Sequence, residues 1–240
     1  MSLARIPKTL LRQYDLHRLI PSRYAEDQDS VLAPIADNSY HLKDLFEIDN
    51  ATNQRLLAES DRLPGIGVDE LVFGIPNFRV INAAFTYPRP EGSRFNGPDR
   101  GAWYCSFELE TALAEVIFHK TVEYTEINFF NDSVSYQLYL ADFSCEFHDI
   151  REVNRREKYL DPHSYQDSQL LSAQLLEQGS LGIIYPSVRK NGGTNLACFR
   201  PALVGDVRKT DRFEFLWSGD KNPKISKVGG KKSRPRLRTF

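Results

Sequence analysis

The sequence predicts one α+β domain in which a mixed β-sheet packs against a few helices. Three observations support this fold class. Candidate strands and helices follow one another irregularly, whereas a doubly wound parallel sheet requires regular strand–helix alternation. The chain has 240 residues, enough to bury about three quarters of the surface that its unfolded form exposes. Its 15 Phe and 11 Tyr residues supply large side chains for a core, and a content of 41% hydrophobic and 26% charged residues is ordinary for a globular protein.

The first 75 residues are predicted to contain mainly helices. Residues 1–24 combine leucines with scattered arginines, which suggests a short helix and then an extended segment that leads into Pro21. From Tyr40 to about Ser60, apolar residues recur at helical intervals between polar turns. We therefore expect residues 25–75 to be a helical elaboration within the domain.

Short elements are predicted between residues 79 and 105. The segment Arg79–Tyr87 is rich in β-branched and aromatic residues and is stopped by two prolines, so we expect a strand there. A turn cluster of Gly, Pro and Asp residues at Gly97–Gly101 then leads into a short aromatic strand at Ala102–Cys105.

An amphipathic helix is predicted directly after this strand. Its apolar residues recur at i, i+3, i+4, i+7 and i+8 and therefore lie on one face: Leu109, Ala112, Leu113, Val116 and Ile117. Ser106 is the expected N-cap, and two glutamates occupy the first turn, where the helix dipole favours negative charge. Glu115 lies at the flank of the apolar face, so its carboxylate can face a cleft while its neighbours anchor the helix.

The C-terminal half is predicted to add one helix and four strands. The helix spans Asp167–Gln178 and is closed by Gly179. A loop from Pro186 to Gly193 ends in two glycines, which permit backbone conformations that other residues resist. The strands are Ser135–Phe143, Ser180–Tyr185, Thr194–Phe199 and Phe213–Trp217.

The net charge of −1 conceals an asymmetry between the two ends of the chain. Residues 221–240 contain eight lysines and arginines and no acid, so the first 220 residues, with 23 basic and 32 acidic side chains, carry −9. We expect residues 1–220 to form the domain and residues 221–240 to be a solvated basic tail; the alternative is a tail that contacts nucleic acid or a partner.

The sequence also bounds the compartment of the protein. No stretch approaches 18 consecutive apolar residues, and the N-terminus lacks the apolar segment of a signal peptide, so we expect a cytoplasmic protein without membrane contact. The three cysteines, Cys105, Cys145 and Cys198, are odd in number and widely spaced, which favours reduced thiols over a disulfide framework or a zinc site.

Common catalytic motifs are missing from the sequence. It contains no Walker-type phosphate loop, no Gly-x-Gly-x-x-Gly, no His-Glu-x-x-His and no Gly-x-Ser-x-Gly, which argues against ATP hydrolysis and zinc proteolysis. Glu115 and His119 are one helical turn apart, but two ligands without a third indicate an ordinary i,i+4 contact more than a metal site.

Four polar residues near the predicted turns and the helix could act together on a dinucleotide. A guanidinium such as that of Arg94 can bind a pyrophosphate through a bidentate fork. The Tyr104 ring can stack on a positively charged nicotinamide, and Glu115 can stabilise the positive charge that builds on a ribose as its bond to nitrogen breaks. Ser187 can hydrogen-bond the ribose or fix the arginine. Three of these residues also have an ordinary alternative: a surface arginine, a core tyrosine and a solvated glutamate.

These residues and their neighbours resemble the RES domain family, which is named for its Arg, Glu and Ser and supplies the toxins of bacterial RES–Xre toxin–antitoxin pairs. The resemblance covers roughly residues 92–200, with a weaker similarity at Arg18–Tyr24, and about 65 residues separate Tyr24 from the Arg94 motif. The segments that carry it are Gly92-Ser-Arg94-Phe-Asn-Gly, Trp103-Tyr104-Cys-Ser, Glu110-Thr-Ala-Leu-Ala-Glu115-Val, Pro186-Ser187-Val-Arg and Gly192-Gly193-Thr-Asn195-Leu.

The resemblance implies an ADP-ribosyltransferase-like fold, with a mainly antiparallel sheet, and an enzyme that consumes NAD⁺. NAD⁺ is then the substrate, cleaved at its nicotinamide–ribose bond with phosphate or water as acceptor, and no metal or bound cofactor is implied. Depletion of NAD⁺ would arrest growth, and a cognate antitoxin would block the site. The residues implied in catalysis are Arg94, Tyr104, Glu115 and Ser187, with Asn195 joining Arg94, Tyr104 and Ser187 in substrate binding.

Two other functions remain open. The nearer one is a protein ADP-ribosyltransferase that uses the same site. The other is a non-enzymatic nucleic-acid-binding module that works through the basic tail, although the sequence lacks the interleaved aromatic and basic strand of RNA-binding domains. A homo-oligomer is compatible with each of these functions.

Overall fold

The structure, a computed structural model, describes residues 6–25, 65–153 and 156–228 and confirms the α+β fold class. Seven strands form one sheet in the order β1-β2-β5-β4-β3-β6-β7. All pairings are antiparallel except the parallel contact between β3 and β4. The strands are β1 (Lys8–Pro21), β2 (Trp103–Ser106), β3 (Asn131–Asp149), β4 (Gly182–Pro186), β5 (Thr194–Cys198), β6 (Gly205–Ser218) and β7 (Lys224–Val228).

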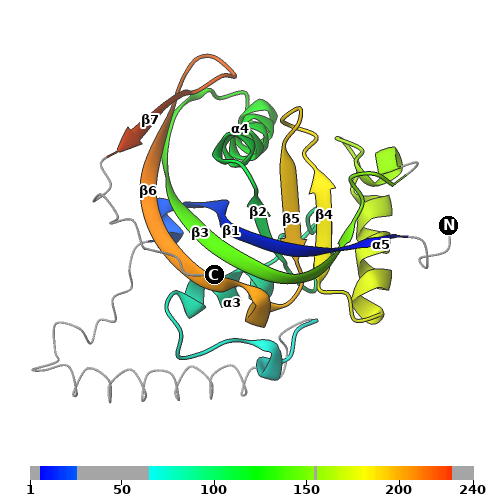
Figure 1. Cartoon of the computed structure of the whole chain (residues 1–240). Helices are drawn as coiled ribbons and strands as arrows, with labels where there is room; N and C mark the ends of the chain where they lie inside the picture. The colour runs from blue at the N-terminus through cyan, green and yellow to red at the C-terminus, as the bar shows by residue number, and fades with distance from the viewer. Residues whose placement is uncertain (1–5, 26–64, 154–155, 229–240) are drawn as a thin grey trace, which may run out of the picture.

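The long strand β3 joins two parts of the sheet. One of its edges pairs with β1, while the other edge pairs with β6 along its first half and with β4 at its end. Because β1 also meets β2 at the pair His17 and Ser106, the strands β1, β2, β5, β4 and β3 form a closed circuit. The strands β6 and β7 extend from this circuit as a curved ribbon (Figure 1).

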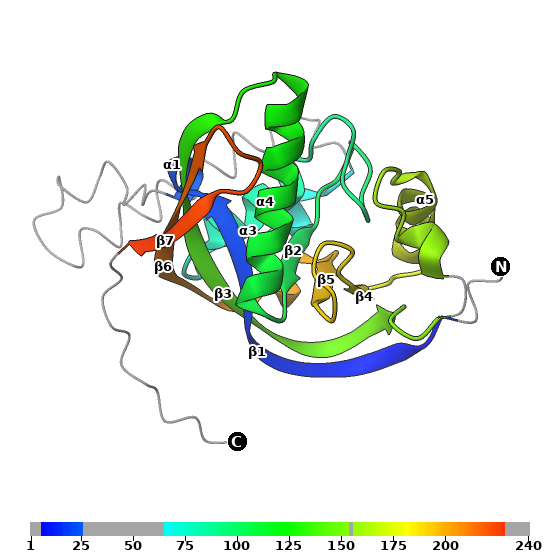
Figure 2. The same cartoon turned by 90° about the horizontal axis from the view of Figure 1, so that it is seen from above.

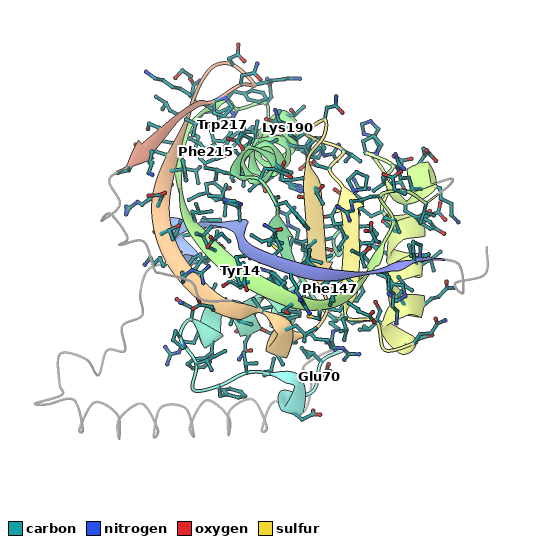
Figure 3. The ribbon with its side chains drawn as sticks, viewed as in Figure 1. Tyr14, Glu70, Phe147, Lys190, Phe215 and Trp217 are labelled. Carbon is teal, nitrogen blue, oxygen red and sulfur yellow. The ribbon has the colours of Figure 1, made fainter. Side chains whose placement is uncertain are left out.

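Helices cover the sheet and bury one apolar side each. Phe215 and Trp217 of β6, whose rings stack at a centroid distance of 6.0 Å, lie in the cluster that packs against Leu113 and Val116 of α4 (Figure 3). The described helices are α1 (Ser22–Ala25), η3 (Val68–Glu70), α3 (Phe78–Thr86), α4 (Leu109–Glu126), η4 (Arg156–Tyr159), α5 (Gln166–Glu177) and η5 (Pro201–Leu203).

The short strands β2, β5 and β4 separate two further apolar clusters. Trp103, Leu196 and Ile184 face one of them, which also contains residues of α3, β1 and β3. Ala197 and Ile183 face the other, which α5 covers. In both cartoons β5 and β4 lie between α4 and α5 (Figures 1 and 2). The ends of these strands are therefore enclosed by helices on two sides.

The predicted N-terminal helix is wrong, because residues 8–21 form strand β1. This strand pairs with β3 along nearly its whole length. A bulge between Gln13 and Leu16, with Asp15 at a φ of 59°, shifts the alternation of side chains in the middle of the strand. A strand with a bulge has no uniform period of two, and its leucines and arginines favour helices in isolation. The long pairing with β3 therefore makes this segment a strand.

The strand predicted at Arg79–Tyr87 is also wrong, because this segment forms helix α3. Ile81 and Phe85, four residues apart, are both fully buried in the core. The spacing of these two side chains matches a helix, and the β-branched residues around them gave the opposite indication. The backbone N–H of Tyr87 bonds to the Ala83 carbonyl and ends the helix before Pro88.

The other elements predicted within the described residues are confirmed, although two strands are longer than predicted: β3 begins four residues earlier and ends six residues later, and β6 begins eight residues earlier. The confirmed elements are the strands at 102–105, 135–143, 180–185, 194–199 and 213–217 and the helices after residue 106 and at 167–178. Gly179 closes α5 with a φ of 76°, as expected for a helix C-terminus. The N-cap of α4 is a correction, because Glu108 and not Ser106 occupies this position; Ser106 ends β2.

The ends and the insertion are only partly described. Residues 26–64 of the expected helical elaboration, including the helix expected from Tyr40 to Ser60, lie outside the described residues, as do residues 229–240. The beginning of the expected basic tail forms strand β7, which pairs with β6 from Arg212 to Leu216. No helix in the described part of the chain is long and apolar enough to cross a membrane.

Candidate active site

The sequence-predicted site residues come from three adjacent strands, one helix and one loop. Tyr104 lies on β2, Asn195 on β5 and Ser187 directly after β4. Glu115 lies on the second turn of α4, and Arg94 lies in the loop before β2. The antiparallel register pairs Asn195 with Ser106 on one side and with Tyr185 on the other. The end of β2, the start of β5 and the end of β4 therefore lie side by side.

The carboxylate of Glu115 is fixed through only one of its oxygens. Its Oε1 accepts a hydrogen bond of 2.8 Å from the Ser187 hydroxyl and another of 2.8 Å from the Asn195 side-chain amide. Among the described residues, no group donates to Oε2 of Glu115. The carboxylate is thus held in one orientation while its second oxygen is left to interact with a substrate.

The two donors to Glu115 are themselves held in place. Asn195 is 2% exposed, and its side-chain oxygen accepts a 2.6 Å hydrogen bond from the Ser106 hydroxyl. The Ser187 oxygen accepts hydrogen bonds of 3.1 Å from the backbone N–H groups of Arg189 and Lys190. A hydroxyl donates one hydrogen bond and accepts two, so Ser187 has no capacity left for a substrate and acts by positioning Glu115.

Arg94 is buried without a carboxylate partner. It is 7% exposed, and its NH1 group donates to the backbone carbonyls of Tyr159 at 3.2 Å and Asp161 at 2.9 Å. Its guanidinium carbon lies 4.7 Å above the centroid of the Tyr165 ring. None of the described acidic residues forms an ion pair with Arg94. Since a buried cation is costly without a counter-charge, this site is suited to an anionic ligand.

Tyr104 supports the loop that carries Arg94. Its hydroxyl donates to Asn96 at 2.8 Å and accepts from the Phe95 backbone N–H at 2.9 Å. Burial raises the pKa of Tyr104 above its ordinary value, so the hydroxyl stays protonated at physiological pH. Gly92 enables the same turn, because its φ is 74° and a side chain there would meet the Asn96 carbonyl.

Comparisons with known proteins identify the family of the chain. The family model of the RES domain matches residues 71–218, a range that includes every site residue named above. The chain belongs to the RES domain family. No match was found among curated proteins. One similar solved structure is the "Crystal structure of the M.tuberculosis MbcT-MbcA toxin-antitoxin complex", with 11% identity, coverage of 88% of this chain and 87% of that chain, and a TM-score of 0.49.

The structure of this RES domain adds Tyr185 to the site. This residue is the last but one of β4, is 7% exposed and packs edge-on against Phe95, with ring centroids 4.7 Å apart. Burial, and then the negative charge of Glu115, raise the pKa of Tyr185 well above its ordinary value, while Arg94 acts in the opposite direction. Tyr185 therefore lies close to both charged site residues. In the sequence, the only indication that Tyr185 belongs to the site is its position directly before Pro186 and Ser187.

Two further charged or titratable groups surround the RES site. Arg18 of β1 donates to the Tyr104 carbonyl at 2.9 Å and lies 4.6 Å over the Trp103 ring, and burial lowers its pKa to about 10. His119 follows Glu115 by one turn of α4, and burial, with the positive charges of Arg89 and Arg189, lowers its pKa to about 4. His119 is therefore neutral at physiological pH, whereas Arg18 is charged.

Proposed function

We propose that this RES domain protein cleaves the nicotinamide–ribose bond of NAD⁺ and acts as the toxin of a type II toxin–antitoxin system. The observation that carries the proposal is the geometry of Glu115, in which Ser187 and Asn195 fix one carboxylate oxygen and leave the other without a partner among the described residues. Membership in the RES family, which the motif resemblance links to NAD⁺ consumption, supports the same reading.

Cleavage of NAD⁺ makes one demand that Glu115 meets. The nicotinamide ring is positively charged in NAD⁺, so it departs as a neutral molecule and needs no general acid. Positive charge builds instead on the ribose, and a fixed carboxylate beside it stabilises that charge in the transition state. The free Oε2 of Glu115 supplies the required charge, and its orientation is already set before the substrate binds.

The other site residues are suited to hold the substrate. The buried and unpaired charge of Arg94 complements the diphosphate of NAD⁺. Tyr104 and Tyr185 both stay protonated because burial raises their pKa values, so neither adds a negative charge that would compete with Glu115. The Tyr104 hydroxyl braces the Arg94 loop, and its ring is the proposed stacking surface for nicotinamide.

One incubation distinguishes water, phosphate and protein as acceptors of the ADP-ribose group. Purified protein is mixed with NAD⁺, with and without inorganic phosphate, and the products are resolved by chromatography. We expect free nicotinamide together with ADP-ribose, or with a phosphorylated ADP-ribose if phosphate is the acceptor. A labelled protein band in place of free ADP-ribose would indicate a protein ADP-ribosyltransferase that uses this site. Unchanged NAD⁺ would contradict the proposal and favour a binding module.

The toxin role has its own test. If NAD⁺ depletion is the output, expression of the protein should arrest growth and lower the cellular NAD⁺ pool. Co-expression of an antitoxin encoded by a neighbouring gene should restore both. Growth and a constant NAD⁺ pool at high expression of the active protein would contradict the toxin role, even where NAD⁺ is cleaved in vitro.

A further inference from the structure

A second arginine lies beside Arg94 and has a similar environment. Arg189 follows Ser187 by two residues, and its guanidinium carbon lies 3.2 Å from the centroid of the Phe118 ring on α4. Its NH2 group donates to the Pro162 carbonyl at 2.9 Å. Like Arg94, it contacts rings and a backbone carbonyl, and it forms no ion pair with the described acidic residues.

One short segment holds both guanidinium groups. Tyr159, the last residue of η4, and Asp161, which follows η4, supply carbonyls to Arg94, and the neighbouring Pro162 supplies one to Arg189. Tyr165, at the end of this segment, packs under the guanidinium of Arg94 and also interacts with that of Arg189. Two positive charges are thus brought to the same place by neutral groups.

Several other described arginines pair with carboxylates, whereas Arg18, like Arg94, has a backbone carbonyl and a ring as neighbours. Arg100 and Arg200 pair with Glu70, Arg151 pairs with Asp149, and Arg208 pairs with three aspartates. Carbonyl groups accept hydrogen bonds from Arg94 and Arg189 but carry no net charge that would compensate theirs. Burial lowers the pKa of Arg189; the positive charge of Arg94 acts in the same direction, whereas Tyr165 and the negative charge of Glu115 act against it. A ligand with two negative charges would offset the repulsion between the two guanidinium groups.

We infer that Arg189 is a second substrate-binding residue, and that Arg94 and Arg189 together bind the diphosphate of the dinucleotide. The inference rests on the proposed function, since it takes NAD⁺ as the substrate. The loop that carries Arg189 is tied to the site through Ser187, whose oxygen accepts the Arg189 N–H and whose hydroxyl donates to Glu115. Ser187 therefore places the diphosphate contact and the carboxylate at a fixed separation.

The test measures binding and turnover in Arg189→Gln. We expect the Kd for ADP-ribose, measured by titration calorimetry, to rise about tenfold or more, because a charge-assisted contact is removed. The KM for NAD⁺ should rise similarly while kcat stays within about threefold, because the diphosphate takes no part in bond breaking. Lys190→Gln is the matched control: this neighbour is exposed, its N–H also bonds to Ser187, and it should bind ADP-ribose within about twofold of the wild type (Figure 3).

A second variant covers the case in which Arg189→Gln does not fold, as judged by its melting transition. Arg189→Lys keeps the charge but loses the planar fork, so we expect ADP-ribose binding to weaken about threefold to tenfold. Wild-type affinity in every folded variant, or a fall in kcat at constant KM, would overturn the role of Arg189 while leaving the proposed function intact. A wild-type protein that binds neither NAD⁺ nor ADP-ribose would overturn both.

Discussion

Two buried arginines in this protein have opposite electrostatic environments. Arg100 is 9% exposed, and both of its terminal nitrogens pair with the Glu70 carboxylate, at 2.7 and 2.8 Å. Arg94 is 7% exposed and has only carbonyl and ring partners among the described residues. Burial is similar, so the difference lies in the counter-charge. An uncompensated buried charge beside the candidate site is suited to an anionic ligand.

The surroundings of Arg100 and Arg94 differ in the same way. Glu70 also pairs with Arg200, and Arg100 donates to the carbonyls of Gly65 and Phe199, so this cluster ties the segment around η3 to the end of β5. The region of Arg94 contains Glu115, but Ser187 and Asn195 hold that carboxylate away from any ion pair. The first region stabilises the fold, and the second keeps charges of both signs available.

The largest expected effect is that of Glu115→Gln. The glutamine keeps the size of the side chain and its contacts near Ser187 and Asn195 but removes the negative charge beside the ribose. We expect NAD⁺ turnover to fall at least about 10²-fold, as when one preorganised electrostatic contact is lost, while NAD⁺ binding is largely retained. Steady-state kinetics and titration calorimetry measure the two quantities. A folded variant with turnover within a few-fold of the wild type would remove Glu115 from the mechanism.

Arg94→Ala should show the complementary behaviour. Loss of the guanidinium removes a charge-assisted contact to the diphosphate, which contributes roughly 1.5–3 kcal/mol, so affinity for NAD⁺ should fall by about tenfold to 150-fold. Because Arg94 has no carboxylate partner in the described part of the chain, its removal leaves no buried acid behind there. We therefore expect unfolding in urea to change less than in a variant of Glu70. Strong destabilisation with unchanged affinity would show that Arg94 is a structural residue like Arg100.

Glu70→Gln tests whether the pair of Arg100 and Glu70 stabilises the fold. It leaves Arg100 buried with no counter-charge, which should destabilise the fold by about 2 kcal/mol, less than for a fully buried pair because the Glu70 side chain is 25% exposed. The folded variant should cleave NAD⁺ at close to the wild-type rate. Urea unfolding followed by circular dichroism gives the stability. A selective loss of turnover would show that the Arg100 cluster belongs to the active site.

The sequence predicted the parts of the site that depend on local patterns. The turn signal at Gly97–Gly101, the aromatic strand with Tyr104 and the apolar face of the helix with Glu115 are all short-range features, and the structure places the strand and the helix as expected. Ser106 was assigned to a helix cap, whereas its hydroxyl supports Asn195 across the pairing of β2 with β5. Tyr185 and Arg189 join the site through contacts with distant segments, which no local period encodes.

The same distinction explains the errors in the fold. Strand β1 is decided by its pairing with β3, at least 115 residues away in the chain, and its bulge at Asp15 hides the alternation that would have marked it. Helix α3 is decided by the burial of Ile81 and Phe85 in a core built from other segments. Local propensity is a weak guide where tertiary contacts carry most of the free energy of folding.

The smallest predicted effect concerns acid stability and also separates the two regions. The pKa of Glu70 is lowered from 4.5 to about 2, mainly by hydrogen bonds from Arg100. Burial acts against this shift, while the charge of Arg100 and a hydrogen bond from Arg200 add to it. The folded state therefore binds this proton less readily than the unfolded chain. The stabilisation is complete above about pH 4.5 and is lost as the pH falls toward 2. Glu70→Gln should accordingly lose less stability than the wild type between these pH values, although it starts from a lower stability.

The control for this measurement is Glu157→Gln, at an exposed glutamate of η4 that forms no ion pair with the described residues. This control should keep the wild-type slope of unfolding free energy against pH, because it leaves the Glu70 cluster unchanged. Arg94→Ala should keep it as well, since Arg94 has no carboxylate partner whose titration it could govern. If Arg94→Ala flattened the slope as much as Glu70→Gln does, an acid would be paired with Arg94 in solution. The contrast between a compensated and an uncompensated arginine would then fail.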